Sequence, residues 1–192
     1  MDKRARILQA AIELFLQQGI EKTTISHIVK KAGIAQGTFY LYFDTKLAVM
    51  PAIAEQMVVT IHDKLHAFSS TASITQKITH CVDVLFDNTS TYKELTKLVY
   101  TGFTQTDEIT QWETIYKPLY DWVHDAIEQA KQDGTVQTAI EAKAAARILV
   151  GAIESTAEQI YLFDETPVVH VAQMKESLVQ FIVSGLGVHE KC

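Results

Sequence analysis

Apolar residues recur every three or four positions along almost the whole chain, which is the spacing of one face of an α-helix. The first segment of this kind covers residues 3–18 and is followed by Gly19, a residue suited to the left-handed end of a helix. Its apolar face consists of Ile7, Leu8, Ala11, Ile12 and Phe15. No long alternation of apolar and polar residues indicates a half-buried strand. The sequence therefore predicts an all-α fold.

The same spacing predicts eight further helices. Pro51 is expected to bend the third of these near its start, and Pro118 to kink the sixth. The small polar residues 69–73 predict a linker. The eight segments are residues 25–32, 35–42, 45–68, 74–88, 92–104, 106–133, 139–163 and 168–186.

Charge is distributed unevenly along the chain. The 17 Lys and Arg against 23 Asp and Glu give a net charge of −6, which alone argues against a nucleic-acid partner. Residues 1–50, however, hold seven basic and four acidic residues, a net charge of +3, whereas the rest carries −9. A basic N-terminal part can therefore approach phosphates while the acidic remainder is repelled by them.

Cysteine usage and hydropathy exclude several classes of protein. Cys81 and Cys192 are too few for a disulfide framework or a four-thiolate metal site. The N-terminal residues do not form a secretory signal, and no apolar run reaches the ~18 residues of a membrane span. Nucleotide-binding and hydrolase motifs are missing from the sequence. We expect a cytoplasmic, non-enzymatic protein with no membrane partner, no metal and no cofactor.

Residues 24–43 carry the most specific pattern, that of a helix-turn-helix. Two short helices that cross steeply need apolar contacts around a glycine turn, which Gly33 provides. The expected contacts are Ile28, Ala32, Ile34, Phe39 and Tyr42. The second helix leaves four residues free of packing that could contact base edges or phosphates: Gln36, Gly37, Thr38 and Tyr40.

These first 50 residues resemble the tetracycline-repressor (TetR) family of bacterial transcriptional regulators. The resemblance rests on Ile7 to Phe15, Gly19-Ile20, Thr23-Thr24-Ile25, Ile28, Ala32-Gly33-Ile34, Gly37-Thr38-Phe39-Tyr40, Tyr42-Phe43 and Lys46. It implies an N-terminal three-helix DNA-binding domain, residues 1–46, and a C-terminal helical effector-binding and dimerisation domain, residues 47–192. The implied function is that of a homodimeric repressor that a small-molecule inducer releases from a palindromic operator on double-stranded DNA.

The resemblance also implies individual contacts with DNA. Thr24 would reach a phosphate, Gln36 and Thr38 would face bases, and Tyr40 and Tyr42 would anchor the backbone. Lys46 would add positive charge at the start of the fourth helix. Ala35 and Val29 depart from the family pattern. Ala35 removes one polar contact, and Val29 crowds the interface between the two helices.

In the C-terminal part, eight residues are candidates for a ligand pocket, although the aromatic ones fit an ordinary helical core equally well. An acidic, aromatic pocket would favour a cationic or amphipathic small molecule. The candidates are Phe86, Tyr100, Phe103, Trp112, Tyr116, Tyr120, Glu154 and Glu158.

The last two predicted helices are candidates for a dimer interface. Small residues make the first of them thin, so that the pair could form a hairpin that a twofold axis doubles into a four-helix bundle. The interface candidates are Gly151, Ala152, Met174, Leu178, Phe181 and Ile182.

Two alternative functions remain open from the sequence. One is a helical metal-dependent enzyme centred on His62 and His66, which share a helix face but lack a recognisable third ligand. The other is a ligand-binding or scaffold protein whose DNA-binding part has lost its function, which the substitution at Ala35 keeps possible.

Overall fold

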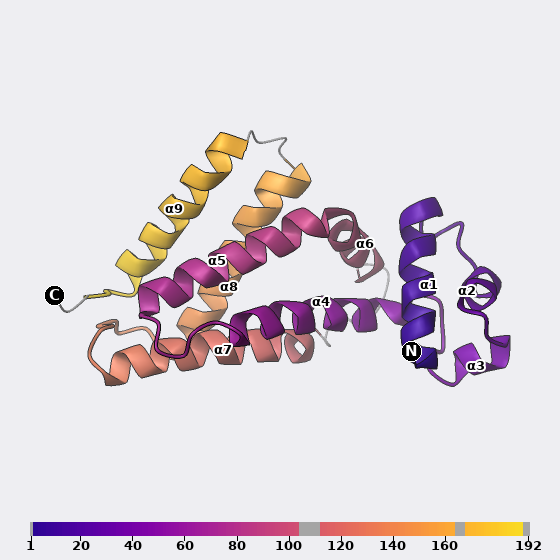
Figure 1. The fold of residues 1–192 in the computed structure, drawn as a ribbon, viewed down its shortest axis with the longest axis horizontal. Helices are drawn as coiled ribbons and strands as arrows, with labels where there is room; N and C mark the ends of the chain where they lie inside the picture. Colours follow the sequence, from indigo (N-terminus) through magenta and orange to yellow (C-terminus); the bar gives the residue numbers. More distant parts are fainter. Residues whose placement is uncertain (1, 104–111, 164–167, 190–192) are drawn as a thin grey trace. The chain divides into compact units, whose positions relative to one another are not determined.

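The computed structural model of the chain describes residues 2–103, 112–163 and 168–189 (Figure 1). In these ranges the only β pairing is an isolated bridge between Val136 and Val188, which confirms the predicted all-α fold. The helices are α1 (Lys3–Gln18), α2 (Ile25–Ala32), α3 (Gln36–Tyr40), α4 (Val49–His66), α5 (Ile74–Thr91), α6 (Lys93–Phe103), α7 (Trp112–Gln132), α8 (Ala142–Glu158), the π-helical turn η2 (Gln159–Phe163) and α9 (Val168–Gly185).

The chain forms two compact units. The first contains the described residues up to Met57 and those of Glu94–Ile115; the second contains those of Val58–Lys93 and from Tyr116 onwards. The predicted boundary at residue 46 falls inside the first unit. This unit also takes in α6, because Leu95 and Val99 pack into the same core as α1–α3.

The first unit is built around α1. This helix packs against α2, which in turn packs against α3. Phe15, Ile28 and Phe39 lose almost all of their accessible surface in this core. The side chains that fill it from the helices and their connections include Ile7, Leu8, Ala11, Phe15, Ile20, Ile28, Val29, Ala32, Phe39, Phe43, Val49, Met50, Ile53, Leu95 and Val99.

In the second unit, α5 packs against both α8 and α9 (Figure 1). An ion pair joins two of these helices, because Lys175 of α9 lies 3.0 Å from Asp83 and 3.5 Å from Asp87 of α5. The Lys175 ammonium also lies 5.3 Å from the centre of the Phe86 ring. The fully buried side chains of this unit include Phe86, Leu85, Leu119, Ile127 and Ile153.

Several predicted helix ends differ from the structure. The helix predicted over residues 35–42 is shorter, since α3 covers only Gln36–Tyr40. The segment predicted from residue 45 becomes helical only at Val49, which places Pro51 in the first turn, where a missing N–H breaks no helical hydrogen bond. The segment 139–163 divides into α8 and η2. Pro118 lies inside α7 as expected, and the start predicted for that helix at residue 106 lies outside the described residues.

The described helices include none that is long and apolar enough to cross a lipid bilayer.

Candidate nucleic-acid interface and interior polar cluster

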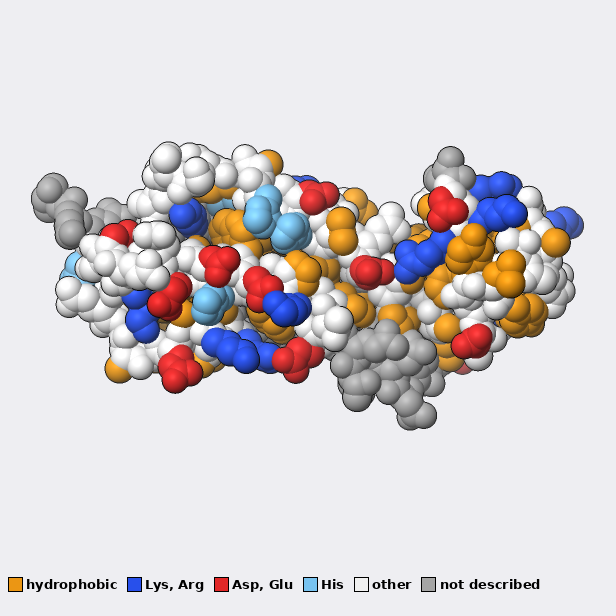
Figure 2. Space-filling model, turned by 90° about the horizontal axis from the view of Figure 1, so that it is seen from below, with side chains coloured by type: hydrophobic (Ala, Val, Ile, Leu, Met, Phe, Trp, Pro, Cys, Tyr) orange, Lys and Arg blue, Asp and Glu red, His pale blue; other side chains and the backbone are white. Residues whose placement is uncertain are grey.

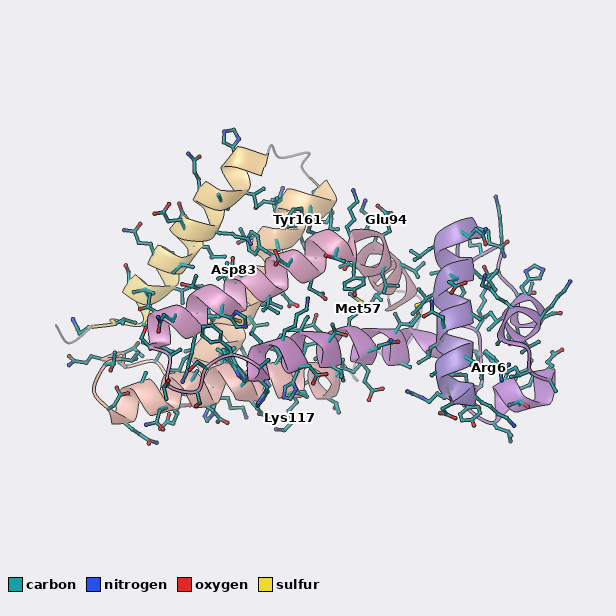
Figure 3. All side chains as sticks on the ribbon, viewed as in Figure 1. Arg6, Met57, Asp83, Glu94, Lys117 and Tyr161 are labelled. Atoms are coloured by element: carbon teal, nitrogen blue, oxygen red, sulfur yellow. The ribbon has the colours of Figure 1, made fainter. Side chains whose placement is uncertain are left out.

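The turn between α2 and α3 is fixed by Gly33 and Arg6. Gly33 adopts the left-handed conformation (φ 63°, ψ 43°) that ends α2. From α1, the Arg6 guanidinium donates hydrogen bonds to the carbonyl oxygens of Ala32 (2.5 Å) and Gly33 (2.9 Å) (Figure 3). Sequence reasoning missed Arg6, because its partners lie 26 and 27 residues further along the chain. Arg6 therefore fixes the position at which α3 begins.

Gly33 and Gly37 provide a matched test of this turn. A Cβ at Gly33 would lie 2.9 Å from Arg6 Nη2 and would need a positive φ, whereas a Cβ at Gly37 would meet no atom within 4 Å. We expect Gly33→Ala to lower the free energy of unfolding by about 1–2 kcal/mol. Gly37→Ala should leave it unchanged or raise it slightly, because alanine favours helix. Urea unfolding of both variants measures the difference; equal effects would contradict this account of the turn.

The N-terminus of α2 is held by a reciprocal cap. The Thr24 hydroxyl accepts a hydrogen bond from the His27 backbone N–H (3.2 Å), and the Thr24 N–H donates to His27 Nδ1 (3.4 Å). Thr24 is exposed, and its hydroxyl hydrogen is not used in this cap. The side chain can therefore donate to a phosphate oxygen without leaving the capping position.

Phe39 is the one residue of α3 that is buried, so the polar residues of this short helix stay accessible. Phe39 is completely buried, and its ring lies 5.8 Å from the ring of Phe43. Gln36 and Gly37 are exposed and Thr38 is half-buried. The exposed fractions of the next apolar and aromatic side chains are 48% for Tyr40, 81% for Leu41 and 40% for Tyr42. Sequence reasoning did not select Leu41.

Lys46 has a structural partner that the sequence did not predict. Its ammonium donates hydrogen bonds to the carbonyl oxygens of Ile20 (2.6 Å) and Thr23 (2.8 Å), in the connection between α1 and α2. An ammonium has three N–H donors, so one remains available for a phosphate. Lys46 therefore holds the α1–α2 connection in place next to the start of α2.

The two departures from the family pattern have visible consequences in the fold. Ala35 is the N-cap residue of α3, which has no side-chain cap. Val29 is accommodated in the core with 7% of its surface exposed.

Basic side chains gather on the first unit (Figure 2). Lys3, Lys22 and Lys30 are exposed. Two others are paired with acids, since Lys31 lies 2.7 Å from Glu13 and Arg4 lies 3.1 Å from Glu55. Hydrogen bonds from Lys31 and Gln9 lower the pKa of Glu13. The first unit thus has exposed positive charge as well as exposed hydrogen-bonding side chains, both of which phosphate binding requires.

The second unit contains a polar cluster among its helices. The Tyr116 hydroxyl of α7 donates a 2.8 Å hydrogen bond to Glu154 of α8. Burial raises the pKa of Glu154 to about 8, the Tyr116 bond opposes this shift, and the nearby Glu158 carboxylate adds to it. Glu154 is therefore mostly protonated at neutral pH. We call Tyr116, Glu154 and Glu158 the interior polar cluster.

Two residues of α5 with polar side-chain atoms are also buried in the second unit. Burial, and secondarily the Glu154 charge, raise the pKa of the Cys81 thiol to about 12, so this thiol stays protonated. Asn88 lies seven residues further on the same face of α5 and is 5% exposed. Its side-chain oxygen is buried and accepts no hydrogen bond. A buried acceptor without a partner costs about 1–3 kcal/mol.

The structure brings four of the eight pocket candidates together. The rings of Tyr116 and Tyr120 lie 5.9 Å apart, and Glu154 and Glu158 lie one turn apart on α8. Phe86 is fully buried beneath Lys175 and 6.2 Å from the Tyr161 ring. The other three candidates, Tyr100, Phe103 and Trp112, have side chains outside the described residues.

The raised pKa of Glu154 predicts a dependence of stability on pH. The folded chain keeps the Glu154 proton up to about pH 8, whereas the unfolded chain loses it near pH 4.5. Stability should therefore fall as the pH rises between these values, by up to about 1.4 kcal/mol per pH unit, and level off above pH 8. Glu154→Gln keeps an acceptor for Tyr116 and removes the titration.

Thermal unfolding of both proteins from pH 5 to pH 9 measures this effect. We expect the stability of Glu154→Gln relative to the wild type to increase with pH up to about pH 8 and to stay constant above it. A stability difference that is constant over the whole range would contradict a buried, protonated Glu154.

The interface candidates of α8 and α9 fall into two groups. Phe181 is 71% exposed and Met174 46% exposed, and Ile148 of α8, which the sequence did not single out, is 63% exposed. Gly151 is exposed and Ala152 half-buried. Leu178 and Ile182 are buried within the chain itself, with 8% and 6% of their surfaces exposed. A partner can therefore contact Phe181, Met174, Gly151 and Ala152, whereas Leu178 and Ile182 are covered by their own chain.

The two histidines of the alternative metal site lie close together. The ring centres of His62 and His66 are 4.1 Å apart. In the part of the chain that the structure describes, no three His, Cys, Asp or Glu residues are grouped so that they could hold a metal ion.

Comparison with known proteins matches both parts of the chain. Residues 7–56 match the family of bacterial regulatory proteins called tetR, and residues 78–186 match the C-terminal domain of tetracyclin repressor-like proteins. A Bacillus subtilis protein described as the uncharacterized HTH-type transcriptional regulator YvdT is 37% identical over 190 residues, covering 96% of this chain and 95% of that protein. The B. subtilis fatty acid metabolism regulator protein is 22% identical and covers 96% of this chain and 95% of its own length.

Solved structures of similar fold cover almost the whole chain. The transcriptional regulator FadR from B. subtilis, in complex with stearoyl-CoA, has a TM-score of 0.76 at 22% identity and covers 96% of this chain and 99% of its own. FadR from Thermus thermophilus, in complex with lauroyl-CoA, has a TM-score of 0.75 at 21% identity and covers 98% and 97%. At these identities the likeness establishes the fold.

Proposed function

Because the chain belongs to the TetR family of bacterial transcriptional regulators, we propose that it is a homodimeric repressor that holds a palindromic operator until a small molecule binds its second unit. The observation that carries the proposal is the surface of α3. The buried Phe39 anchors this helix in the core of the first unit. Four residues of the helix remain wholly or partly accessible to DNA: Gln36, Gly37, Thr38 and Tyr40. The side chains of Gln36 and Thr38 can reach base edges in a major groove, and the Tyr40 hydroxyl can reach a phosphate.

The first unit provides anchors around this helix. Thr24 keeps a free hydroxyl hydrogen, Lys46 keeps one N–H, and Tyr42 is exposed just beyond α3. Contacts of these groups with phosphates would fix the register of α3 along the duplex. Leu41 adds an exposed apolar side chain that can pack against a thymine methyl group or a deoxyribose.

The second unit supplies the dimer. Phe181, Met174 and Ile148 are large apolar side chains exposed on α8 and α9 of a single chain. Their burial against a second copy around a twofold axis would remove them from water. Two copies then present two α3 helices to half-sites that lie roughly one turn of DNA (~34 Å) or somewhat more apart.

The response to a ligand follows from linkage between two states of the dimer. A ligand in the second unit lowers operator affinity only to the extent that it prefers a state in which the two first units do not match the operator. Acyl-CoA thioesters are one candidate class, since two FadR proteins of the same fold were solved with them.

Selection of bound genomic fragments tests the proposal. Purified protein is mixed with sheared DNA of its source genome, the retained fragments are sequenced, and small molecules are added to preformed complexes. We expect enrichment of fragments with inverted half-sites and loss of the complex with at least one class of small molecule. Retention without sequence preference would contradict the proposal. It would favour the alternative in which this is a ligand-binding protein without an operator.

A further inference from the structure

The face of α3 that points away from the core is formed by Gly37 and Leu41. Successive helical residues are rotated by about 100°, so both lie about 160° around the axis from the buried Phe39 and about 40° from each other. Leu41 is the C-cap residue and keeps helical backbone angles (φ −73°, ψ −17°), so the same rotation extends to it. Gly37 and Leu41 therefore lie on the side of α3 opposite the core of the first unit.

Leu41 has the largest exposed fraction, 81%, of the large apolar side chains in the ranges that the structure describes. An exposed leucine is ordinary on a protein surface, so the exposure alone indicates no partner. Its position is more specific. On the circumference of α3, Leu41 lies between Tyr40 on one side and Thr38 on the other, and both of these are proposed contacts with DNA. A duplex that contacts both residues therefore covers Leu41 as well.

Gly37 leaves room for a close approach of the duplex. A helical side chain leans toward the N-terminus of its helix, so Leu41 extends over the turn that contains Gly37. A Cβ at Gly37 would meet no atom within 4 Å, so the surface beside Leu41 is open. Base edges can approach the backbone at this glycine, and the end of the Leu41 side chain can then contact them.

The chemistry of the major groove decides which base suits Leu41. Thymine carries a 5-methyl group there, whereas the other bases present mainly hydrogen-bond donors and acceptors. Leu41 has no polar side-chain atom, so a donor or acceptor covered by it would lose water without gaining a hydrogen bond. A methyl group covered by the same side chain loses only apolar contact with water, which is favourable.

We propose that Leu41 is a specificity-determining residue that selects thymine, through contact of its side chain with the 5-methyl group of one thymine in each half-site. This selection rests on the proposed function, because it names a base that α3 reads. Contact with a deoxyribose would differ from it, since every nucleotide provides the sugar and such a contact carries no sequence preference. The operator should therefore contain thymine at one fixed position of each half-site.

Replacement of thymine by uracil tests the contact, because uracil lacks the methyl group and keeps the O4 acceptor and the pairing with adenine. In a fragment obtained by genomic selection, each symmetric pair of thymines is replaced in turn. Fluorescence anisotropy then measures the affinity of the full chain for each fragment. We expect one pair at which uracil lowers affinity by about 15-fold, which corresponds to about fourfold for each methyl group.

Two variants assign the effect to its residue. Leu41→Ala should bind the thymine fragment at least about 15-fold more weakly than the wild type, and uracil at the sensitive pair should change its affinity by no more than about twofold. Leu16→Ala is the control, since it removes a leucine that is 48% exposed on α1. It should keep both the operator affinity and the uracil effect. Circular dichroism should be the same in both variants and the wild type.

Two results would overturn the selection of thymine by Leu41 and leave the proposed function intact. One is a palindromic operator in which no pair of thymines is sensitive to uracil. The other is a uracil effect of equal size in the wild type and in Leu41→Ala. A chain that binds DNA without any sequence preference would overturn the proposed function and this inference together, since selection of thymine is itself a sequence preference.

Discussion

Thr38→Ala and Tyr40→Ala should each reduce operator affinity by a factor between roughly 30 and 20,000. A good side-chain contact with a base, as expected for Thr38, is worth about 1–3 kcal/mol, and a hydrogen bond to a charged phosphate, as expected for Tyr40, about 1.5–3 kcal/mol. A dimer loses the contact in both half-sites. Tyr40 is 48% exposed and Thr38 half-buried, whereas the buried Phe39 holds α3 in place. The helix should therefore survive both substitutions, and the loss should lie in binding alone. Fluorescence anisotropy with a selected operator fragment measures it.

Tyr92→Ala is the matched control for this pair. Tyr92 is a tyrosine of similar exposure, 39%, at the C-terminal end of α5 in the second unit. The Tyr92→Ala variant should keep its operator affinity within a factor of about two of the wild-type value. The circular dichroism spectrum and the dimer mass should be the same in all three variants and the wild type. Unchanged operator affinity in both Thr38→Ala and Tyr40→Ala would show that α3 is not the helix that reads DNA.

Phe181→Glu should convert the dimer to a monomer and lower operator affinity by more than about a hundredfold. Phe181 is 71% exposed in the single chain, so its burial in a dimer is worth about 1.5–3 kcal/mol per copy. A glutamate there would add two buried like charges across a twofold axis. A monomer also loses the advantage of binding two half-sites at once. Sedimentation equilibrium gives the mass, and anisotropy gives the affinity.

Val59→Glu separates dimer loss from a general effect of added charge. Val59 is a comparable apolar residue on α4, 50% exposed. This variant should remain dimeric and bind the operator as the wild type does. A dimer that persists in Phe181→Glu would exclude the exposed face of α9 from the interface.

The helices that the sequence predicted best are those whose ends are set by neighbouring residues. The bounds of α1 and α2 agree with the prediction, because Gly19 and Gly33 end these helices and Thr24 caps the second. Such signals act within four residues and can be read from a single sequence. The polar residues of α3 could also be selected, because only Phe39 is needed to anchor so short a helix.

The parts that the sequence did not predict depend on contacts between distant residues. Lys46 bonds to carbonyl oxygens 23 and 26 residues away, and Arg6 bonds to Ala32 and Gly33. Neither partner can be inferred from local spacing. One difference has a local cause instead. The Thr45 hydroxyl accepts a hydrogen bond from the Ala48 N–H and holds a turn there, so that α4 starts only at Val49.

Burial separated residues that looked equivalent in sequence. Met174, Leu178, Phe181 and Ile182 all follow helical spacing, but Leu178 and Ile182 face the interior of their own chain. Helical spacing identifies an apolar helix and leaves open which part of its circumference meets the rest of the chain. Asn88 was missed for a related reason, because a single asparagine in an apolar helix carries no pattern that marks its oxygen as unpartnered.

Footprinting of a selected operator fragment tests the central claim most directly, that α3 of two chains reads a palindromic site. Hydroxyl-radical cleavage with the wild-type chain should show two protected segments related by twofold sequence symmetry, with centres roughly one DNA turn (~34 Å) or somewhat more apart. Native mass spectrometry of the same complex should show two chains, or a multiple of two, per fragment. A single protected segment bound by one chain would contradict the account.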